Sequence, residues 1–163
     1  MIKPIIEWLG NLPPSLATFL LATLPLGELR ASIPVAILQY DLHPAWSFAI
    51  SVVGNMVPVF IGLAALNLFV GWLRRKIKLF DRFFTWLFSW TQRRHQQKFK
   101  RWGDLALIVL VAIPLPMTGA YTGAMAAYVF GVPAKRAIPL IFIGVLIAGI
   151  IVTVATLGVF SFI

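Results

Sequence analysis

The sequence predicts an entirely α-helical integral membrane protein made of two inverted repeats. Three features lead to this prediction: long uncharged runs, shorter apolar runs broken by proline and glycine, and a similarity between the two halves of the chain. Of the 163 residues, 60% are hydrophobic and 12% are charged, whereas soluble domains are about half apolar and about a quarter charged. The composition therefore indicates a chain whose main solvent is lipid.

Two runs are long enough to cross a bilayer completely. Residues 44–73 and residues 137–163 contain no charged side chain. A hydrocarbon core of about 30 Å requires about 20 helical residues, so each run predicts one full transmembrane helix. Gly144, Gly149 and Gly158 in the second run would allow a neighbouring helix to approach closely.

Two other apolar runs are too short to cross. Residues 15–24 stop at Pro25, and residues 105–113 stop at Pro114. Ten helical residues at about 1.5 Å each reach only halfway through the core. Because a second short apolar run follows each break, we predict two re-entrant hairpins with non-helical backbone at membrane depth. A single crossing remains the alternative. The expected tip residues are Pro25, Gly27 and Pro34 in the first hairpin, and Pro114, Pro116, Gly119 and Gly123 in the second.

The two halves of the chain are similar at an offset of 89 residues. Ser15 and Asp104 align as expected helix N-caps, and eight identical pairs follow without a gap, including Pro25 with Pro114 and Pro44 with Pro133. Each copy would contain one hairpin and one full crossing, and a single crossing reverses the orientation of the next copy. The chain is thus expected to be one membrane domain. Its parts are repeat one at about 15–73, a basic segment at 74–103 and repeat two at about 104–163.

Positive charge is concentrated between the repeats. Ten of the fourteen basic residues fall between Arg74 and Arg101, as the positive-inside rule expects of a cytoplasmic flank. This clustering favours a membrane flank over nucleic-acid binding, and an amphipathic helix over 79–92 would lie in the membrane interface. The second hairpin would also keep Lys135 and Arg136 on the cytoplasmic side. We expect a bacterial or organellar inner membrane of the plasma type.

Candidate binding residues gather at the predicted tips. Glu28 and Arg30 are the charged residues placed at membrane depth, where ionisable groups usually serve function. Glu28 could exchange a proton or a coupling cation while Arg30 holds an anionic group. Alternatively, the two charges neutralise each other and only fix the tip. The hydroxyls expected opposite them belong to Thr118, Tyr121 and Thr122.

Two segments resemble a known family. They are Pro-Leu-Gly-Glu-Leu-Arg-Ala-Ser-Ile-Pro at 25–34 and Ile-Pro-Leu-Pro-Met-Thr-Gly-Ala-Tyr-Thr-Gly-Ala at 113–124. The sequence is similar to the small multidrug export proteins and, more distantly, to the DedA/VTT superfamily. This resemblance implies a transporter with two facing re-entrant hairpins, and its DedA-like side implies proton-dependent transport or flipping of lipid-linked phosphates. The second tip carries Met117 and Thr118 rather than an acid, so a mechanism with two carboxylates is not expected.

The function expected from the sequence is a proton-coupled transporter or flippase for an amphipathic, phosphate-bearing substrate. The alternatives are a small-molecule multidrug exporter and a non-transporting scaffold that remodels the bilayer. Expected partners are membrane lipids, such a substrate and a second copy of the chain, but no nucleic acid. No cofactor, metal site or enzymatic activity is expected, because no catalytic or metal-ligating cluster is visible and cysteine is absent.

Overall fold

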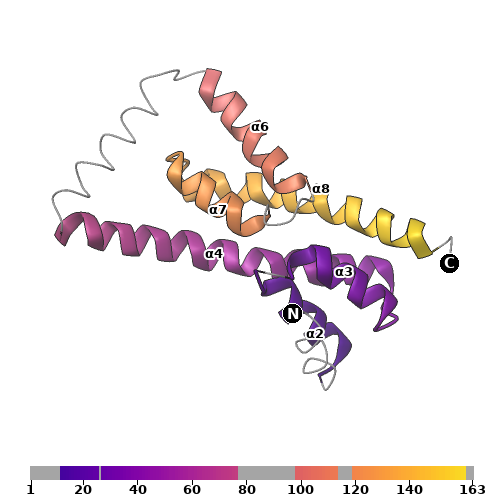
Figure 1. The fold of residues 1–163 in the computed structure, drawn as a ribbon. Coiled ribbons are helices and arrows are strands. Elements are labelled where there is room, and N and C mark those ends of the chain that lie inside the picture. The colour runs from indigo at the N-terminus through magenta and orange to yellow at the C-terminus, as the bar shows by residue number, and fades with distance from the viewer. Residues whose placement is uncertain (1–11, 26, 77–97, 114–118, 161–163) are drawn as a thin grey trace.

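The computed structural model describes residues 12–25, 27–76, 98–113 and 119–160. All regular structure in these ranges is helical, so the predicted all-α class is confirmed (Figure 1). The helices are α2 (Pro14–Thr23), α3 (Glu28–Leu38), α4 (Pro44–Lys76), α6 (Lys98–Ala112), α7 (Ala120–Val129) and α8 (Ala134–Phe160). The interfacial helix predicted at 79–92 lies outside the described residues.

Two of these helices are long and apolar enough to cross a membrane. The qualifying segments are Pro44–Leu66 of α4 and Ala134–Val159 of α8. They confirm the two long apolar helices expected from the uncharged runs. Among the described helices each is preceded by two shorter ones, so the order short, short, long occurs twice.

The predicted caps of the short helices are wrong at both positions. Helix α2 begins at Pro14, with Pro13 at its N-cap and no capping side chain. Proline suits the first position of a helix, as at Pro14, because its fixed φ angle is helical and an N–H there would have no partner within the helix. Helix α6 begins at Lys98, so Asp104 lies inside it. The Asp104 carboxylate instead forms an ion pair with Arg136 in the first turn of α8.

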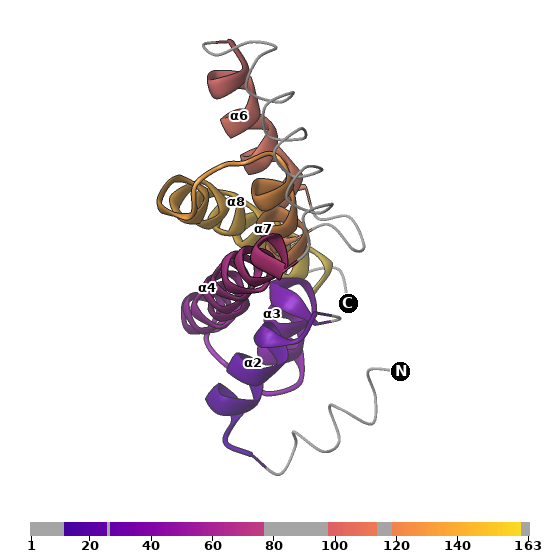
Figure 2. The ribbon, with the colours of Figure 1, turned by 90° about the vertical axis from the view of Figure 1, so that its left-hand side faces the viewer.

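The long helices organise the molecule. Figures 1 and 2 show α2 and α3 toward one side of the molecule and α6 and α7 toward the other, with α4 between them. Helices α4 and α8 run in opposite directions in Figure 1. Buried side chains from α3, α4, α6, α7 and α8 form one apolar core, in which Ile33, Val59, Val111 and Ile141 are almost completely buried.

Glycines allow the short helices to cross the long ones closely. A β-carbon at Gly54 of α4 would lie 2.7 Å from the Phe19 carbonyl oxygen of α2. One at Gly144 of α8 would lie 2.9 Å from the Ile108 carbonyl oxygen of α6. Both separations are too short for a real methyl group, so the two crossings depend on glycine. Gly149 packs against Phe48, whereas Gly158 has no such neighbour within the described chain.

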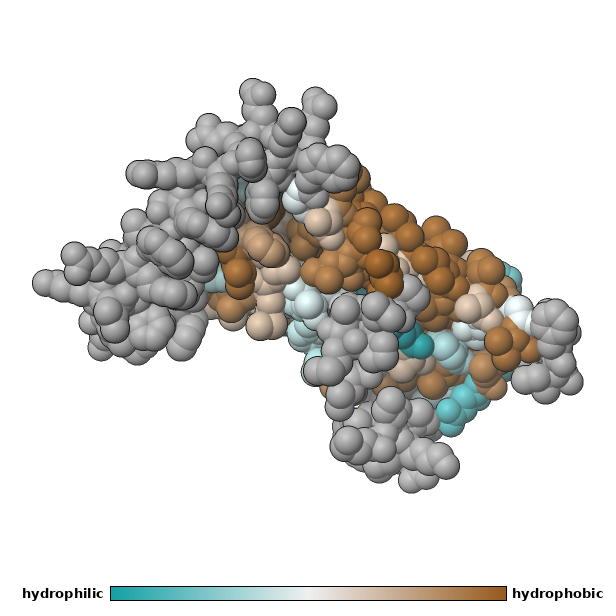
Figure 3. Space-filling view, turned by 45° about the horizontal axis from the view of Figure 1, so that its top comes forward, coloured by the Kyte–Doolittle hydropathy of each residue, from teal (hydrophilic) through white to brown (hydrophobic). Residues whose placement is uncertain are grey.

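Much of the outer surface is apolar. Figure 3 shows a broad hydrophobic area on one face of the molecule. Helix α8 contributes many exposed aliphatic and aromatic side chains, as expected for a helix in contact with lipid tails. They are Phe142, Ile143, Ile147, Ile150, Ile151, Val154, Leu157 and Val159.

The crossing of α2 and α4 generates a first prediction. Replacing Gly54 by alanine should destabilise the protein by about 1–3 kcal/mol, because the methyl group would overpack against α2. Gly62→Ala on the same helix is the matched control, since no atom lies within 4 Å of its β-position. Thermal unfolding in detergent measures both. Equal melting temperatures for the two variants would contradict the close crossing.

Candidate functional site

Glu28 lies where the two halves of the molecule meet. It is the first residue of α3, and it is only 9% exposed. Its φ angle is 45°, in the left-handed region that side chains other than glycine rarely adopt. A buried carboxylate on a strained backbone is stable only if surrounding groups hold it in place.

The Glu28 carboxylate is held by the N-terminus of α7. Gly119 is the N-cap of this helix, and a β-carbon there would lie 1.9 Å from Oε2 of Glu28. The backbone N–H of Tyr121 donates a hydrogen bond to Glu28. The carboxylate therefore supplies, from α3, the capping acceptor that Gly119 lacks. Its negative charge also faces the positive end of the helix dipole.

Arg30 makes the complementary contact at the end of α6. Its guanidinium donates a 3.0 Å hydrogen bond to the carbonyl oxygen of Ile113, the residue that follows the last residue of α6. The last carbonyls of a helix lack partners within the helix and carry partial negative charge. The first turn of α3 thus offers an anion to the start of α7 and a cation to the end of α6. These are the two helix ends on either side of residues 114–118.

Tyr121 returns the contact to the first half. Its hydroxyl donates to the carbonyl oxygen of Thr23, the last residue of α2. The C-terminal end of each first short helix therefore receives a donor from the second short helix of the other half. Glu28, Arg30, Gly119 and Tyr121, all predicted site residues, lie together at this junction.

The remaining predicted residues have different positions. Thr122 follows Tyr121 on α7 and is half-buried. Gly123 is buried against Val111 and Ile141, so its role in the described chain is helix packing. Thr118, Pro114 and Pro116 lie outside the described residues.

The non-helical segment between α2 and α3 is shorter than the sequence predicted. Pro25 is exposed between α2 and α3, and Gly27 is the N-cap of α3. A β-carbon at Gly27 would lie 2.4 Å from the Leu21 carbonyl oxygen, so this turn requires glycine. Pro34 was expected at the tip but lies inside α3. A helix can continue through proline when neighbouring helices pack around it.

Sequence reasoning missed a stripe of polar side chains on α4, the helix that packs against α3. Ser47, Ser51 and Asn55 recur every four residues on α4, and all three are buried. The Ser32 hydroxyl of α3 donates to the Ser51 hydroxyl at 2.8 Å. The side-chain oxygen Oδ1 of Asn55 has no hydrogen-bond partner in the described chain. The four-residue spacing was the available signal.

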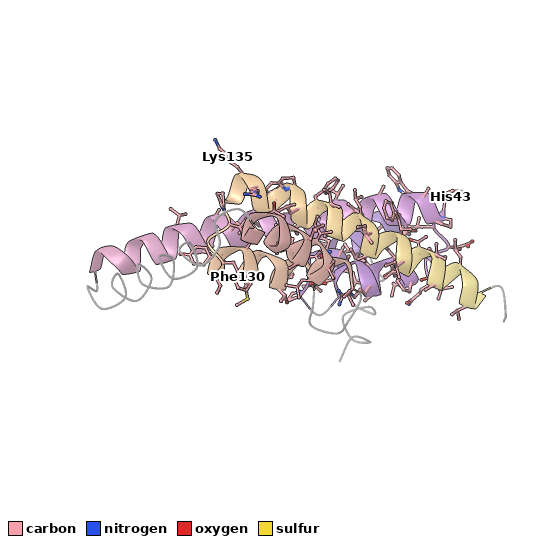
Figure 4. The ribbon with its side chains drawn as sticks, turned by 90° about the horizontal axis from the view of Figure 1, so that it is seen from above. His43, Phe130 and Lys135 are labelled. Atoms are coloured by element: carbon pink, nitrogen blue, oxygen red, sulfur yellow. The ribbon has the colours of Figure 1, made fainter. Side chains whose placement is uncertain are left out.

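Other polar residues lie at the starts of the two long helices. His43 and Lys135 are at opposite ends of the long helices in Figure 4. Arg136 pairs with Asp104, and both are partly exposed. Within the described ranges, no cluster of His, Asp or Glu side chains could hold a metal ion.

The fold and the junction define a class of protein. Two long apolar helices, with a buried carboxylate and a partly exposed guanidinium at the ends of the short helices, are typical of helical membrane proteins with polar sites at depth. The profile of the family described as "Putative small multi-drug export protein" matches residues 28–151, and the chain belongs to this family. No curated protein and no solved structure gives a significant match.

A second prediction follows from the contact between Gly119 and Glu28. Gly119→Ala should destabilise the protein by about 1–3 kcal/mol, because the new methyl group would occupy the position of the carboxylate. Gly158→Ala, which meets no neighbour, is the control. In a double-mutant cycle with Glu28→Ala, the two costs should be far from additive. Additive melting-temperature losses would mean that the two residues do not touch.

Proposed function

We propose that this protein is a proton-coupled membrane transporter or flippase for an amphipathic, phosphate-bearing substrate. The observation that carries the proposal is the junction at which Glu28 and Arg30 meet the helix ends of the opposite half. Ionisable groups buried in a membrane protein usually mark the path of a substrate or a proton. Broken helices in corresponding positions of two repeats are a typical feature of transporter binding sites.

We further propose that the chain consists of two inverted repeats, each with a re-entrant hairpin and one crossing. Helices α2, α3 and α7 have 10, 11 and 10 residues, or about 15–17 Å of length, too little to cross. The repeated order of short, short and long helices supports the duplication. The opposite directions of α4 and α8 in Figure 1 support the inversion.

Basic residues at the start of α8 support one orientation. Lys135 and Arg136 lie in the first turn of α8, and His43 precedes α4 at the opposite end of the molecule (Figure 4). The positive-inside rule would then place the start of α8 in the cytoplasm, together with the basic segment 74–101, and the start of α4 outside.

The substrate class follows from the donors at the junction. The guanidinium of Arg30 and the N-terminus of α7 both favour a negatively charged group, and phosphate is bound well by each. The exposed apolar surface of α8 would accommodate the apolar part of an amphipathic molecule. The more distant resemblance to DedA-like proteins, which suggests lipid-linked phosphates, remains a prediction.

A second candidate function is export of small drug-like molecules. The description of the family favours it. Such substrates are often lipophilic cations, which Arg30 would repel. Competition between a phosphate-bearing lipid and a lipophilic cation in one flux assay separates the two candidates.

The test of transport uses the purified protein in liposomes. Flux of a fluorescent lipid phosphate should rise when a proton gradient is imposed. Glu28→Gln keeps the shape of the side chain but removes its charge change, so it should abolish the gradient dependence. Asp104→Asn removes an acid far from the junction and serves as the control. No protein-dependent flux at any pH would instead favour a non-transporting scaffold.

Orientation is tested by cysteine labelling, which is clean because the chain has no native cysteine. Cysteines at Ser89 and Ala134 should react with an impermeant reagent from the cytoplasmic side, and one at Asp41 from the outside. Labelling of position 134 from outside would overturn the second hairpin and the inverted repeat.

A further inference from the structure

The donors suited to an anionic substrate already hold an anion of the protein itself. The Glu28 carboxylate accepts from the Tyr121 N–H and lies against Gly119 at the N-terminus of α7. Arg30 lies two residues away on the same turn. An incoming phosphate group and the carboxylate would therefore compete for the same N–H groups and the same positive field.

We propose that an anionic ligand binds at the N-terminus of α7 only when Glu28 takes up a proton and turns to Asn55. In this exchange the proton joins a carboxylate oxygen, the hydrogen bond from Tyr121 passes to the ligand, and the new O–H donates to Oδ1 of Asn55. No other covalent bond forms or breaks. The inference rests on the proposed anion site, and it adds the group that occupies the site when the ligand is absent.

Asn55 provides the position that a protonated Glu28 would take. Its side chain is 1% exposed, and its Oδ1 has no hydrogen-bond partner in the described chain. A buried acceptor without a donor is rare and calls for an explanation. An ionised carboxylate only accepts, but a protonated one has an O–H that can donate to an amide oxygen.

The register of α3 and α4 places the two residues at one level. Ser32 and Ser51 are hydrogen-bonded across the two helices, which are joined by a short connection at 39–43. Helix α4 therefore returns along α3. Glu28 is one turn before Ser32, and Asn55 is one turn after Ser51, so a turn on each helix leads to the same depth.

Among the described side chains of the neighbouring helices, Glu28 is the titratable group suited to this role. Arg30 on α3 and Tyr121 on α7 are the groups that interact electrostatically with it. Helix α2 contributes none, and α4 has none from 44 to 73. Asp104 of α6 is paired with Arg136, and together with Lys135 it lies near the start of α8. Arginine and tyrosine keep their charge states near neutral pH, so the proton belongs to Glu28.

The exchange determines the direction of coupling. A proton and a single negative charge enter the site together, so the loaded site has the same net charge as the empty one. Proton and anion would then cross in the same direction, as in a symporter. The left-handed backbone of Glu28 agrees with a residue pulled into place by its carboxylate, since release of that contact would also release strain.

The experiment is calorimetric titration of the full-length protein in detergent, in two buffers with different ionisation enthalpies. The probes are sulfate and dihexanoyl phosphatidylglycerol, whose charges do not change between pH 5 and 8. Wild type should take up about one proton per anion, and above the apparent pKa of binding its affinity should fall about tenfold per pH unit. Glu28→Gln should bind without proton uptake and without this pH dependence. Binding of the lipid alone would identify a headgroup site, and binding of both probes a site for the anion itself.

Asn55→Leu tests the alternative position of the carboxyl group. It removes the acceptor and keeps the branched shape of the side chain, so anion affinity at low pH should fall at least about tenfold, the value of one buried hydrogen bond to a polar partner. Thr156→Val, which removes a buried hydroxyl bonded within α8, should change nothing. Melting curves in detergent show whether each variant is folded, and Glu28→Gln tests the exchange even if Asn55→Leu does not fold.

Three results would overturn the inference. They are anion binding by wild type without proton uptake, an unchanged pH dependence in Glu28→Gln, and failure of both proteins to bind either probe. Proton-linked binding without flux in liposomes would refute transport and leave this exchange standing. Proton-driven flux without proton-linked binding would refute the exchange and leave transport standing.

Discussion

The contact between the Glu28 carboxylate and the N-terminus of α7 is the constraint on which the rest of the structure depends. A carboxylate that is 9% exposed must receive hydrogen bonds, because a buried charge without partners is costly. Inside an apolar bundle, free backbone N–H groups occur only where a helix begins. Helix α7 therefore has to begin beside α3, and residue 119 has to be glycine because any β-carbon would collide with the carboxylate.

The same requirement explains why the two halves need each other. A broken helix leaves carbonyl groups without partners at the break, and lipid cannot satisfy them. In this protein α3 supplies Arg30 to the end of α6, and α7 supplies Tyr121 to the end of α2. Neither half could satisfy its own break with these donors. The glycines at 54 and 144 then allow each long helix to pack directly on the first short helix of its own half.

These contacts connect stability with the proposed function. Groups that complete the breaks are also the groups suited to an anion and a proton, so a ligand would have to replace internal contacts rather than enter an empty site. Such an arrangement couples binding to a structural change, since each partner displaced must find another. The buried stripe of Ser47, Ser51 and Asn55 offers polar partners within α4 for that purpose. The drug-export description of the family names a broad function, and the junction narrows the proposed chemistry to anions.

The sequence alone determined the helical class, the two long apolar helices and the breaks between the short ones, because uncharged length and proline position are local properties. It also singled out Glu28, Arg30, Gly119 and Tyr121 as residues of one site. Only the tertiary structure decided their roles: Glu28 caps α7, Arg30 contacts Ile113, and Tyr121 contacts Thr23. It also moved Asp104 from a cap to an ion pair and placed Pro34 inside a helix. Those outcomes depend on which helix ends lie side by side, and residues 83 or 98 positions apart are brought together by packing that no local pattern encodes.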